Sequence, residues 1–261
     1  MEPVLLSLRR EGPIAHLALA RPEVRNAFNA KLIAQLHEAT VQLGEDASIR
    51  AVVLSGQGKT FCGGADIQWM RASLELTHEA NLEDARGMSR MFRAIDTLPK
   101  PVIGRIHGAA LGGGSGLAAC CDVAIASADT VFGFTETKLG IMPAVISPFV
   151  LAKIGRTHAR ALALTGERFD ARRALAIGLI HEVVATEADL DAAIERVTAE
   201  VCSASPTGVA ATKALFARVS EESYDATLET TAHAIAAQRT SPEGQDGLRA
   251  FLEKRRPVWM Q

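Results

Sequence analysis

The sequence predicts an α/β protein in which a body of alternating strands and helices is followed by a helical C-terminal region. Short apolar runs that suit strands recur through the first two-thirds of the chain, separated by stretches with apolar residues at helical spacing. After about residue 145 the pattern is mostly helical. With 261 residues and 48% hydrophobic side chains, the chain is long enough to bury one large core.

Composition and charge exclude several classes of protein. The formal net charge is -2, and no basic stripe typical of a nucleic-acid binder is present. No apolar run reaches the roughly 18–20 residues that cross a bilayer, and the order of charges in the first twelve residues does not suit a signal peptide. Because the cysteines form no CxxC pair, we expect reduced thiols, no metal site and a cytoplasmic protein; they are Cys62, Cys120, Cys121 and Cys202.

The first elements expected are a hairpin, a helix and a third strand. The runs VLLSLRR at 4–10 and IAHLALA at 14–20 flank Glu11-Gly12, a pair that favours a hairpin turn. A helix follows, with Asn29 placed to cap it, Gly44 to end it, and apolar residues at helical spacing between them. The run AVVLSG at 51–56 then predicts a buried strand.

Further along, one amphipathic helix precedes three more strands. Its apolar face holds Met88, Met91, Phe92, Ile95 and Leu98. The strands expected after it are PVIGRIHG at 101–108, CDVAIAS at 121–127 and VFGF at 131–134. In the C-terminal region, Ser205-Pro206 and Ser241-Pro242 each place a capping serine before a proline at the first helical position.

Two loops that follow strands are rich in glycine. Both AVVLSGQGKTFCGGAD and PVIGRIHGAALGGG consist of an apolar strand, a loop and small residues that open a helix. Such a plan aims backbone N–H groups at one point, and two such points facing each other would bind an anion. Glycine as a spacer for tight backbone packing explains the same pattern equally well.

The stretch from Gly114 to Ala119 also fits the GxGxxA dinucleotide fingerprint, and Glu136 follows Gly116 by twenty positions. In a nucleotide-binding fold the first glycine sits at the very end of a strand. Here the strand is expected to end near Ile106, with a loop before the glycines, so we do not favour a nucleotide site.

Several motifs together resemble the enoyl-CoA hydratase/isomerase (crotonase) family over nearly the whole chain. They are RPEVRNAFN at 21–29, FCGGADIQ at 61–68, IHGAALGGGSGLAACCDVAIAS at 106–127, FGFTETKLGIMP at 132–143 and GERFDARRALAIGLIHEVV at 166–184. Within the family, SGLAACCD and GFTETKLGIMPAVISPFV look most like bacterial methylglutaconyl-CoA and isohexenylglutaconyl-CoA hydratases.

The resemblance implies a crotonase (ClpP-like) spiral of ββα turns with a C-terminal helical region. We therefore expect a core domain over 1–200 and a helical trimerisation region over 201–261. The family forms trimers, which often pair into hexamers. Its substrates are acyl-CoA thioesters, so coenzyme A enters with the substrate and no separate cofactor is expected.

The resemblance also assigns catalytic residues. The two amides that bind the thioester oxygen fall on Ala65 and Gly113, and the acid/base falls on Glu136. Typical hydratases carry a second glutamate where this chain has Gly116. We expect Gly116 to leave room for a branched or carboxylated acyl group, such as 3-methylglutaconyl. Beside it, the Ser115 hydroxyl is expected to cap the start of a helix rather than to carry a proton.

Other positions are expected to contact the substrate. Arg25 lies in the segment that binds coenzyme A in the family, where a solvated arginine is nearly as plausible, and Asp66 can instead brace its loop. Phe251 and Lys254 match positions from which a neighbouring subunit reaches the nucleotide end of coenzyme A. The complete set of expected binding residues is Arg25, Ala27, Gly64, Asp66, Ile67, Trp69, Gly116, Met142, Phe251 and Lys254.

The expected reaction is the addition of water to an enoyl-CoA, or its reverse, through an enolate held by the two amides. A single glutamate also suits an isomerase that moves one proton between carbons. A non-catalytic binding protein of the same fold is the alternative outside enzymes, and the presence of Glu136 with both amide positions disfavours it.

Overall fold

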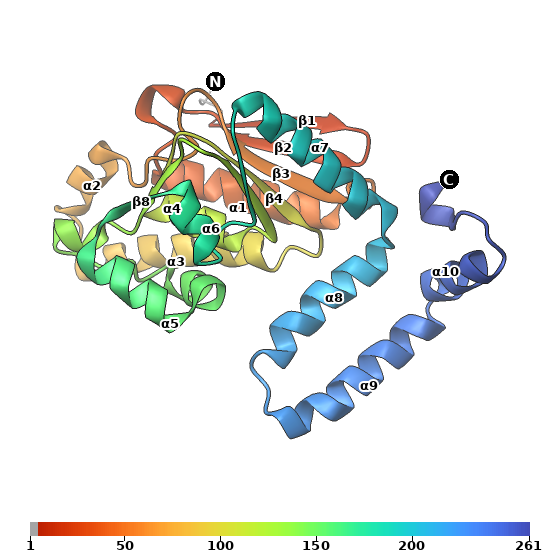
Figure 1. The fold of residues 1–261 in the computed structure, drawn as a ribbon. Helices are drawn as coiled ribbons and strands as arrows, with labels where there is room; N and C mark the ends of the chain where they lie inside the picture. The colour runs from red at the N-terminus through yellow and green to blue at the C-terminus, as the bar shows by residue number, and fades with distance from the viewer. Residues whose placement is uncertain (1–4) are drawn as a thin grey trace.

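The computed structural model describes residues 5–261, and it begins with the expected hairpin. Strand β1 (Leu6–Glu11) pairs antiparallel with β2 (Ile14–Leu19) around the Glu11-Gly12 turn (Figure 1). Val4, the first residue of the expected strand, lies outside the described residues. The hairpin prediction is otherwise confirmed.

Within residues 5–261 the main sheet is six-stranded, in the order β1-β2-β3-β4-β6-β9. After the hairpin its strands run parallel: β3 (Ala51–Gly56), β4 (Val102–Ile106), β6 (Val123–Ser127) and β9 (Glu182–Val184). Parallel strands need crossover connections, and helices supply them here. The expected strands at 51–56, 101–108 and 121–127 are confirmed within a few residues.

Helices cover both faces of this sheet. On one face, side chains of α1 (Ala30–Glu45) and α3 (His78–Asp96) join a core that includes Leu17 and Leu54. On the other face, Leu190 and Ile194 of α7 (Glu187–Ser203) pack on Val53 and its neighbours. Asn29 caps α1 as predicted, because its side chain accepts a hydrogen bond from the Leu32 N–H at 2.8 Å.

A second sheet holds three short strands in the order β5-β7-β8, again among the described residues. They are β5 (Ala109–Leu111), β7 (Val131–Gly133) and β8 (Arg168–Asp170). One expectation was wrong here, because the segment before Gly112 is a strand rather than a loop. The region after residue 145 is mostly helical as predicted, and it also contributes β8 and β9. β7 confirms the strand expected at 131–134, whereas the three residues of β5 show no alternation that separates them from a loop.

The remaining helices of the body connect these sheets. They are α2 (Ile67–Ser73), α4 (Gly113–Cys120), α5 (Ser147–Thr165) and α6 (Ala171–Ala176), with 3₁₀ turns η1 (Pro22–Val24) and η2 (Glu136–Leu139). Helix α4 begins directly after β5, and η2 follows closely after β7. The ends of the small sheet therefore supply both the glycine-rich helix start and Glu136.

The C-terminal helices form an arm that stands away from the body (Figure 1). It comprises α8 (Pro206–Val219), α9 (Tyr224–Thr240), α10 (Pro242–Leu252) and the 3₁₀ turn η3 (Val258–Met260). Ser205 and Ser241 cap α8 and α10 as predicted. The expected boundary after residue 200 falls in the last turn of α7, so the arm begins a few residues later.

Polar contacts fix the base of the arm to the body. The Lys213 ammonium lies 2.7 Å from the Asp122 carboxylate, and Arg50 donates to the Trp259 carbonyl at 3.0 Å. Among the described residues, no helix is both long and apolar enough to cross a membrane.

Candidate active site

The two glycine-rich loops lie against each other. The Cys62 N–H donates to the Ala109 carbonyl and the Leu111 N–H donates to the Cys62 carbonyl, both at 3.0 Å. A Cβ on Gly114 would lie 2.5 Å from the Cys62 carbonyl oxygen, closer than any real contact. The glycines therefore allow one backbone to pack on the other, and this contact brings both loops to one cavity.

Two backbone N–H groups face that cavity without a partner. The hydrogen bonds from Phe28 N–H to Gly64 and from Asp66 N–H to Phe28 leave the N–H of Ala65 unpaired within residues 5–261. Gly113 is the first residue of α4, so its N–H has no acceptor in the helix. Both residues line the same cavity. This arrangement is the one that the resemblance implies for binding a thioester oxygen.

A buried polar network holds the Ala65 loop in place. The Arg21 guanidinium lies 2.7 Å from the Asp66 carboxylate, and both side chains are buried. Asn26 is fully buried, accepts from the Arg21 N–H, and donates to the carbonyls of Gln57 and Thr60. Because backbone carbonyls and a buried ion pair fix this segment, the Ala65 N–H is preorganised.

Sequence reasoning missed Arg21 and Asn26 as positioning residues, although both fall in the RPEVRNAFN motif. The sequence signal that could have identified this segment is the asparagine at position 26. Asn26 has a φ of 55°, in the left-handed region that asparagine tolerates better than most residues. A polar residue with this preference next to a predicted site marks a turn that needs side-chain hydrogen bonds.

The cavity has a volume of about 460 Å³ and is mostly apolar. Helices α2 and α3 form one wall, the two glycine loops form its floor, and η2 with the segment 141–146 forms the opposite wall. Trp69 is fixed across the first wall by a hydrogen bond from its Nε1 to Asp84 at 3.0 Å. The apolar side chains that line the wall opposite are Leu139, Ile141, Met142, Pro143, Val145 and Ile146.

Glu136 is the acidic group beside the two free amides. Its Oε1 lies 3.1 Å from where a Cβ on Gly112 would be, and Gly112 directly precedes Gly113. Its Oε2 is buried without a hydrogen-bond partner among the described residues. Burial raises the pKa of this carboxyl above the ordinary glutamate value, and a hydrogen bond from its own backbone offsets only part of the shift. A carboxyl with a free oxygen and a raised pKa can exchange protons with a ligand.

Gly116 does not line the cavity, which corrects the expectation that its missing side chain makes room for substrate. A Cβ on Gly116 would lie 2.3 Å from Ile146 Cγ2 and 3.1 Å from Phe92 Cε1. A glutamate at this position would therefore collide with Ile146 at its Cβ. This side chain is buried and also contributes to the cavity wall.

The other expected binding residues divide into three groups. Arg25, Gly64, Trp69 and Met142 line the cavity. The lining residues do not include Ala27, Asp66 or Ile67. The Ala27 carbonyl and the Asp66 carboxylate both accept from the Arg21 guanidinium, and Ile67 is the first residue of α2. Phe251 and Lys254 lie in the exposed C-terminal arm, at or just after the end of α10.

Ser115 is not a helix cap, contrary to expectation. Gly112 holds the N-cap position of α4 and has a φ of 52°, which favours glycine. The Ser115 hydroxyl is buried and donates to the Ala110 carbonyl at 2.6 Å, and it accepts from the Gly133 N–H at 3.3 Å. It therefore links β5 to β7 and does not face the cavity.

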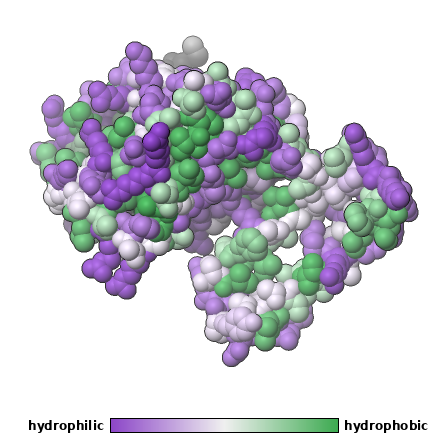
Figure 2. All heavy atoms as spheres, viewed as in Figure 1, coloured by the Kyte–Doolittle hydropathy of each residue, from purple (hydrophilic) through white to green (hydrophobic). Residues whose placement is uncertain are grey.

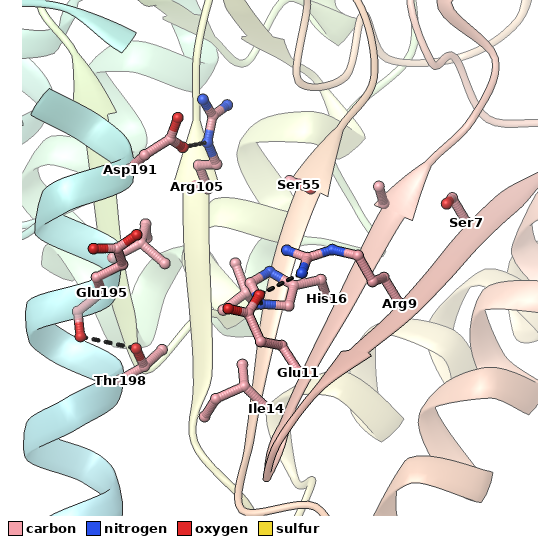
Figure 3. A pocket seen from close by; sticks show the side chains of 13 residues that line it. Ser7, Arg9, Glu11, Ile14, His16, Ser55, Arg105, Asp191, Glu195 and Thr198 are labelled. Atoms are coloured by element: carbon pink, nitrogen blue, oxygen red, sulfur yellow. Dashed lines mark hydrogen bonds and ion pairs between the residues drawn. The ribbon is translucent and has the colours of Figure 1, made fainter. Parts of the chain in front are cut away.

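A larger hollow, of about 590 Å³, lies on the sheet face between the hairpin and α7 (Figure 3). Arg9 pairs with Glu11 there, and Arg105 lies 2.6 Å from Asp191. No expected site residue lines it, and of its three acids within residues 5–261 Glu11 and Asp191 are each paired with an arginine, while Glu195 is the third. Among the described residues no group of three or more His, Cys, Asp or Glu could hold a metal ion.

Comparison with known proteins agrees with this geometry. The profile of the enoyl-CoA hydratase/isomerase family matches residues 9–261. Crotonyl-CoA hydratase of Syntrophomonas wolfei is 32% identical over 251 residues, which cover 95% of each chain.

Two solved structures are similar over nearly all of both chains. An enoyl-CoA hydratase from Shewanella pealeana is 39% identical, covers 98% of this chain and 96% of its own, and has a TM-score of 0.95. AtuE of Pseudomonas aeruginosa is 38% identical, covers 99% of this chain and 100% of its own, and has a TM-score of 0.96. These matches confirm the crotonase fold with its helical C-terminal region, and the chain belongs to the enoyl-CoA hydratase/isomerase family.

Proposed function

We propose that this protein is an enoyl-CoA hydratase that adds water across the double bond next to the thioester. The observation that carries the proposal is the position of Glu136 beside two unpaired N–H groups. Glu136 lines the cavity that Ala65 and Gly113 also line, and its Oε2 has no hydrogen-bond partner among the described residues. A thioester oxygen bound by these amides would hold the α and β carbons of the acyl group near Glu136.

Glu136 and the two amides can carry out hydration in three steps. The Glu136 carboxylate takes a proton from water while the water oxygen bonds to Cβ. Electrons of the double bond then move to the thioester oxygen, where the Ala65 and Gly113 N–H groups stabilise the negative charge. The protonated Glu136 finally gives its proton to Cα. One carboxyl suffices if hydroxyl and proton reach the same face of the double bond.

The amides supply the electrostatic part of catalysis. They are fixed by the backbone, so they need not reorganise when charge develops on the thioester oxygen. Each donor of this kind is typically worth about 10²–10³ in rate. The raised pKa of Glu136 serves the other part, because a carboxyl that binds protons more tightly is a better base for water.

A short acyl group, branched or carboxylated as in 3-methylglutaconyl-CoA, is the substrate that we propose. The cavity of about 460 Å³ suits a small ligand. Arg25 lines the cavity beside the Ala65 loop and supplies a cation for the coenzyme A end. Coenzyme A enters as part of the substrate, and no separate cofactor is needed for the steps derived above.

Isomerisation of the double bond is the second candidate, and one observation favours it. Ile146 blocks a side chain at position 116. Of the two carboxyls among the described residues that line the cavity, Asp84 accepts the Trp69 hydrogen bond, which leaves Glu136 to act on the substrate. An isomerase needs only one base that moves a proton between two carbons. The two reactions differ because only hydration takes an oxygen atom from water. A non-catalytic binding protein would show neither reaction.

We further propose that the chain acts as a trimer, or a pair of trimers, assembled through the C-terminal arm. Figure 2 shows apolar side chains gathered along this arm. Exposed apolar patches of this kind mark protein–protein interfaces. The strongly exposed ones are Phe216, Tyr224, Leu228, Phe251 and Leu252. The cysteines are free thiols, which suits the reducing cytoplasm.

Turnover of a small panel of thioesters tests the proposed hydration. Crotonyl-, 3-methylcrotonyl- and 3-methylglutaconyl-CoA are each followed by the loss of enoyl absorbance. At least one should be hydrated, and Glu136→Gln should lower kcat by about two to four decades, the usual worth of general acid–base catalysis. A loss under threefold, with chemistry rate-limiting, would place the base elsewhere.

A further inference from the structure

The charged groups around the cavity differ in whether they have a partner. Among the described residues, the charged side chains that line it are Arg25, Asp84, Glu136 and Arg168. Asp84 accepts the hydrogen bond from Trp69, and Glu136 is the proposed acid/base. Neither guanidinium has an ion-pair or hydrogen-bond partner within residues 5–261. The cavity therefore offers two free cations to a ligand.

These two cations belong to opposite sides of the site. Arg25 lies on the Ala65 side, where its carbonyl accepts the Gly63 N–H at 2.8 Å and a Cβ on Gly63 would be 3.2 Å from the Arg25 Cβ. Arg168 lies on the Glu136 side, in β8. The coenzyme A portion of a thioester carries phosphate groups, which Arg25 beside the amides can bind. Arg168 lies on the other side of the site and is therefore free to bind a different anion.

The backbone places Arg168 next to the catalytic loop. Its position in β8 is opposite Gly133 of β7, and paired residues in an antiparallel ladder have Cα atoms about 4.5–5.5 Å apart. The Gly133 carbonyl accepts the Gly112 N–H at 2.8 Å, and Glu136 follows three residues after Gly133. Arg168 thus belongs to the same short sheet that carries both Gly112 and Glu136.

The acidic residues closest to Arg168 in the sequence already have other partners. Glu167 lies 2.8 Å from Arg173, and Asp170 caps α6 by accepting from the Arg173 N–H at 2.8 Å. Glu136 does not pair with Arg168 either, since its Oε2 has no hydrogen-bond partner and no ion pair joins the two side chains among the described residues. The Arg168 guanidinium is exposed, lines the cavity and remains available.

We propose that Arg168 binds a carboxylate at the far end of the acyl chain and selects dicarboxylic acyl-CoA substrates. This assignment rests on the proposed function and extends it to substrate class. Arginine presents a planar fork of N–H donors that matches a carboxylate with two hydrogen bonds. An enoyl-CoA without the second carboxylate leaves this fork unpaired and loses the contact.

A pair of substrates that differ only in that group isolates the contact. 3-Methylglutaconyl-CoA has a terminal carboxylate, and 3-methylcrotonyl-CoA lacks it. In Arg168→Gln, kcat/KM for the first should fall about ten- to a hundredfold, the range for a hydrogen bond to a charged group. For the second it should stay within about twofold of the parent, and Arg168→Lys should restore part of the selectivity.

Arg172→Gln is the matched control, since Arg172 is an exposed arginine four residues away on α6 that does not line the cavity. It should leave both substrates unchanged. An equal loss for both substrates in Arg168→Gln would assign Arg168 to the coenzyme A portion and overturn the proposal. No selective loss would also overturn it.

Binding separates this assignment from the proposed reaction. In a Glu136→Gln background, calorimetry measures Kd for the same two thioesters with and without Arg168→Gln. Weaker binding confined to 3-methylglutaconyl-CoA supports the carboxylate contact even if the parent hydrates neither thioester, in which case hydration alone is wrong. Equal affinities across the series contradict the Arg168 contact, whatever the parent turns over.

Discussion

Ile146 occupies the space that any side chain at Gly116 would need. Its Cγ2 lies 2.3 Å from where a Cβ on Gly116 would be, and its Cβ lies 2.9 Å from that point. Both residues are buried. The absence of a side chain at Gly116 therefore makes room for the Ile146 side chain, and it adds no space to the cavity for the acyl group. Since Asp84 accepts the hydrogen bond from Trp69, Glu136 is the carboxyl of the cavity that remains to move protons.

Replacing Gly116 with alanine should destabilise the fold. The added Cβ forces Ile146 or Phe92 to move, and overpacking of this kind typically costs about 1–3 kcal/mol. Gly87→Ala is the control, because a Cβ on Gly87 in α3 meets nothing closer than an Arg90 nitrogen at 3.9 Å. That change should stabilise by up to about 1 kcal/mol. Urea unfolding measures both, and a Gly116→Ala protein as stable as the parent would refute the packing relationship.

Restoring a second glutamate should require removal of Ile146. Gly116→Glu alone is expected to unfold or to lose much of its stability, because its side chain has no space. Ile146→Gly removes both the Cγ2 and the Cβ that a side chain at position 116 would meet, so in the double variant the new carboxyl can reach the cavity wall that Ile146 now forms. Hydration of crotonyl-CoA should then be faster than in Ile146→Gly alone. A slower double variant with intact folding would show that position 116 cannot serve as the second acid.

Removing the Gly113 amide should reduce turnover sharply. Gly113→Pro deletes the N–H at the first helical position, where proline is tolerated. Its ring atoms also approach Phe28, since a Cβ on Gly113 would lie 2.8 Å from Phe28 Cε2. Gly113→Ala shares that clash and keeps the N–H. We expect kcat of the proline variant to be about 10²–10³ below that of the alanine variant. Equal rates in folded proteins would remove Gly113 from the oxyanion site.

The raised pKa of Glu136 predicts two opposite effects of pH. Hydration needs the carboxylate, so kcat/KM should fall on acidification at a pH above that of an ordinary glutamate. Stability changes the other way. Because the folded pKa exceeds the unfolded one, ionised Glu136 costs stability above the folded pKa, and this cost disappears below the unfolded pKa.

Glu136→Gln should therefore be more stable than the parent at neutral pH. The difference in unfolding free energy should shrink on acidification and level off below about pH 4, under the unfolded pKa of glutamate, where the parent carboxyl is protonated in both states. Urea unfolding at a series of pH values measures this difference. A gap that widens on acidification would contradict a pKa raised by burial.

Elements with several turns or a clear apolar run could be predicted from the sequence. The hairpin, the Asn29 cap, the parallel strands and the serine caps of the arm each have local signals that do not depend on distant residues. Strands β5, β8 and β9 have only three residues each. β7 is equally short, but its apolar VFGF run could be predicted, whereas these three depend on pairing with neighbouring strands.

At the site, local motifs predicted which backbone groups come together, but not what fills the space around them. The glycine loops and Glu136 meet as expected at one cavity. The partnership of Gly116 with Ile146 joins residues thirty positions apart and depends on how α4 and the start of α5 pack. Arg168 lies within the quoted motif at 166–184, but the sequence did not single it out. Its proposed role depends on its guanidinium having no ion-pair partner among the described residues, which only the three-dimensional structure shows.

Incubation with an enoyl-CoA in H₂¹⁸O tests most directly whether Glu136 performs hydration with the two amides. Mass spectrometry of the product from crotonyl- or 3-methylglutaconyl-CoA should show a 3-hydroxyacyl-CoA that carries one ¹⁸O from solvent. Glu136→Gln should incorporate the label at least a hundredfold more slowly, by the usual worth of general acid–base catalysis. Recovery of a thioester with a shifted double bond and no ¹⁸O would contradict hydration and identify the protein as an isomerase.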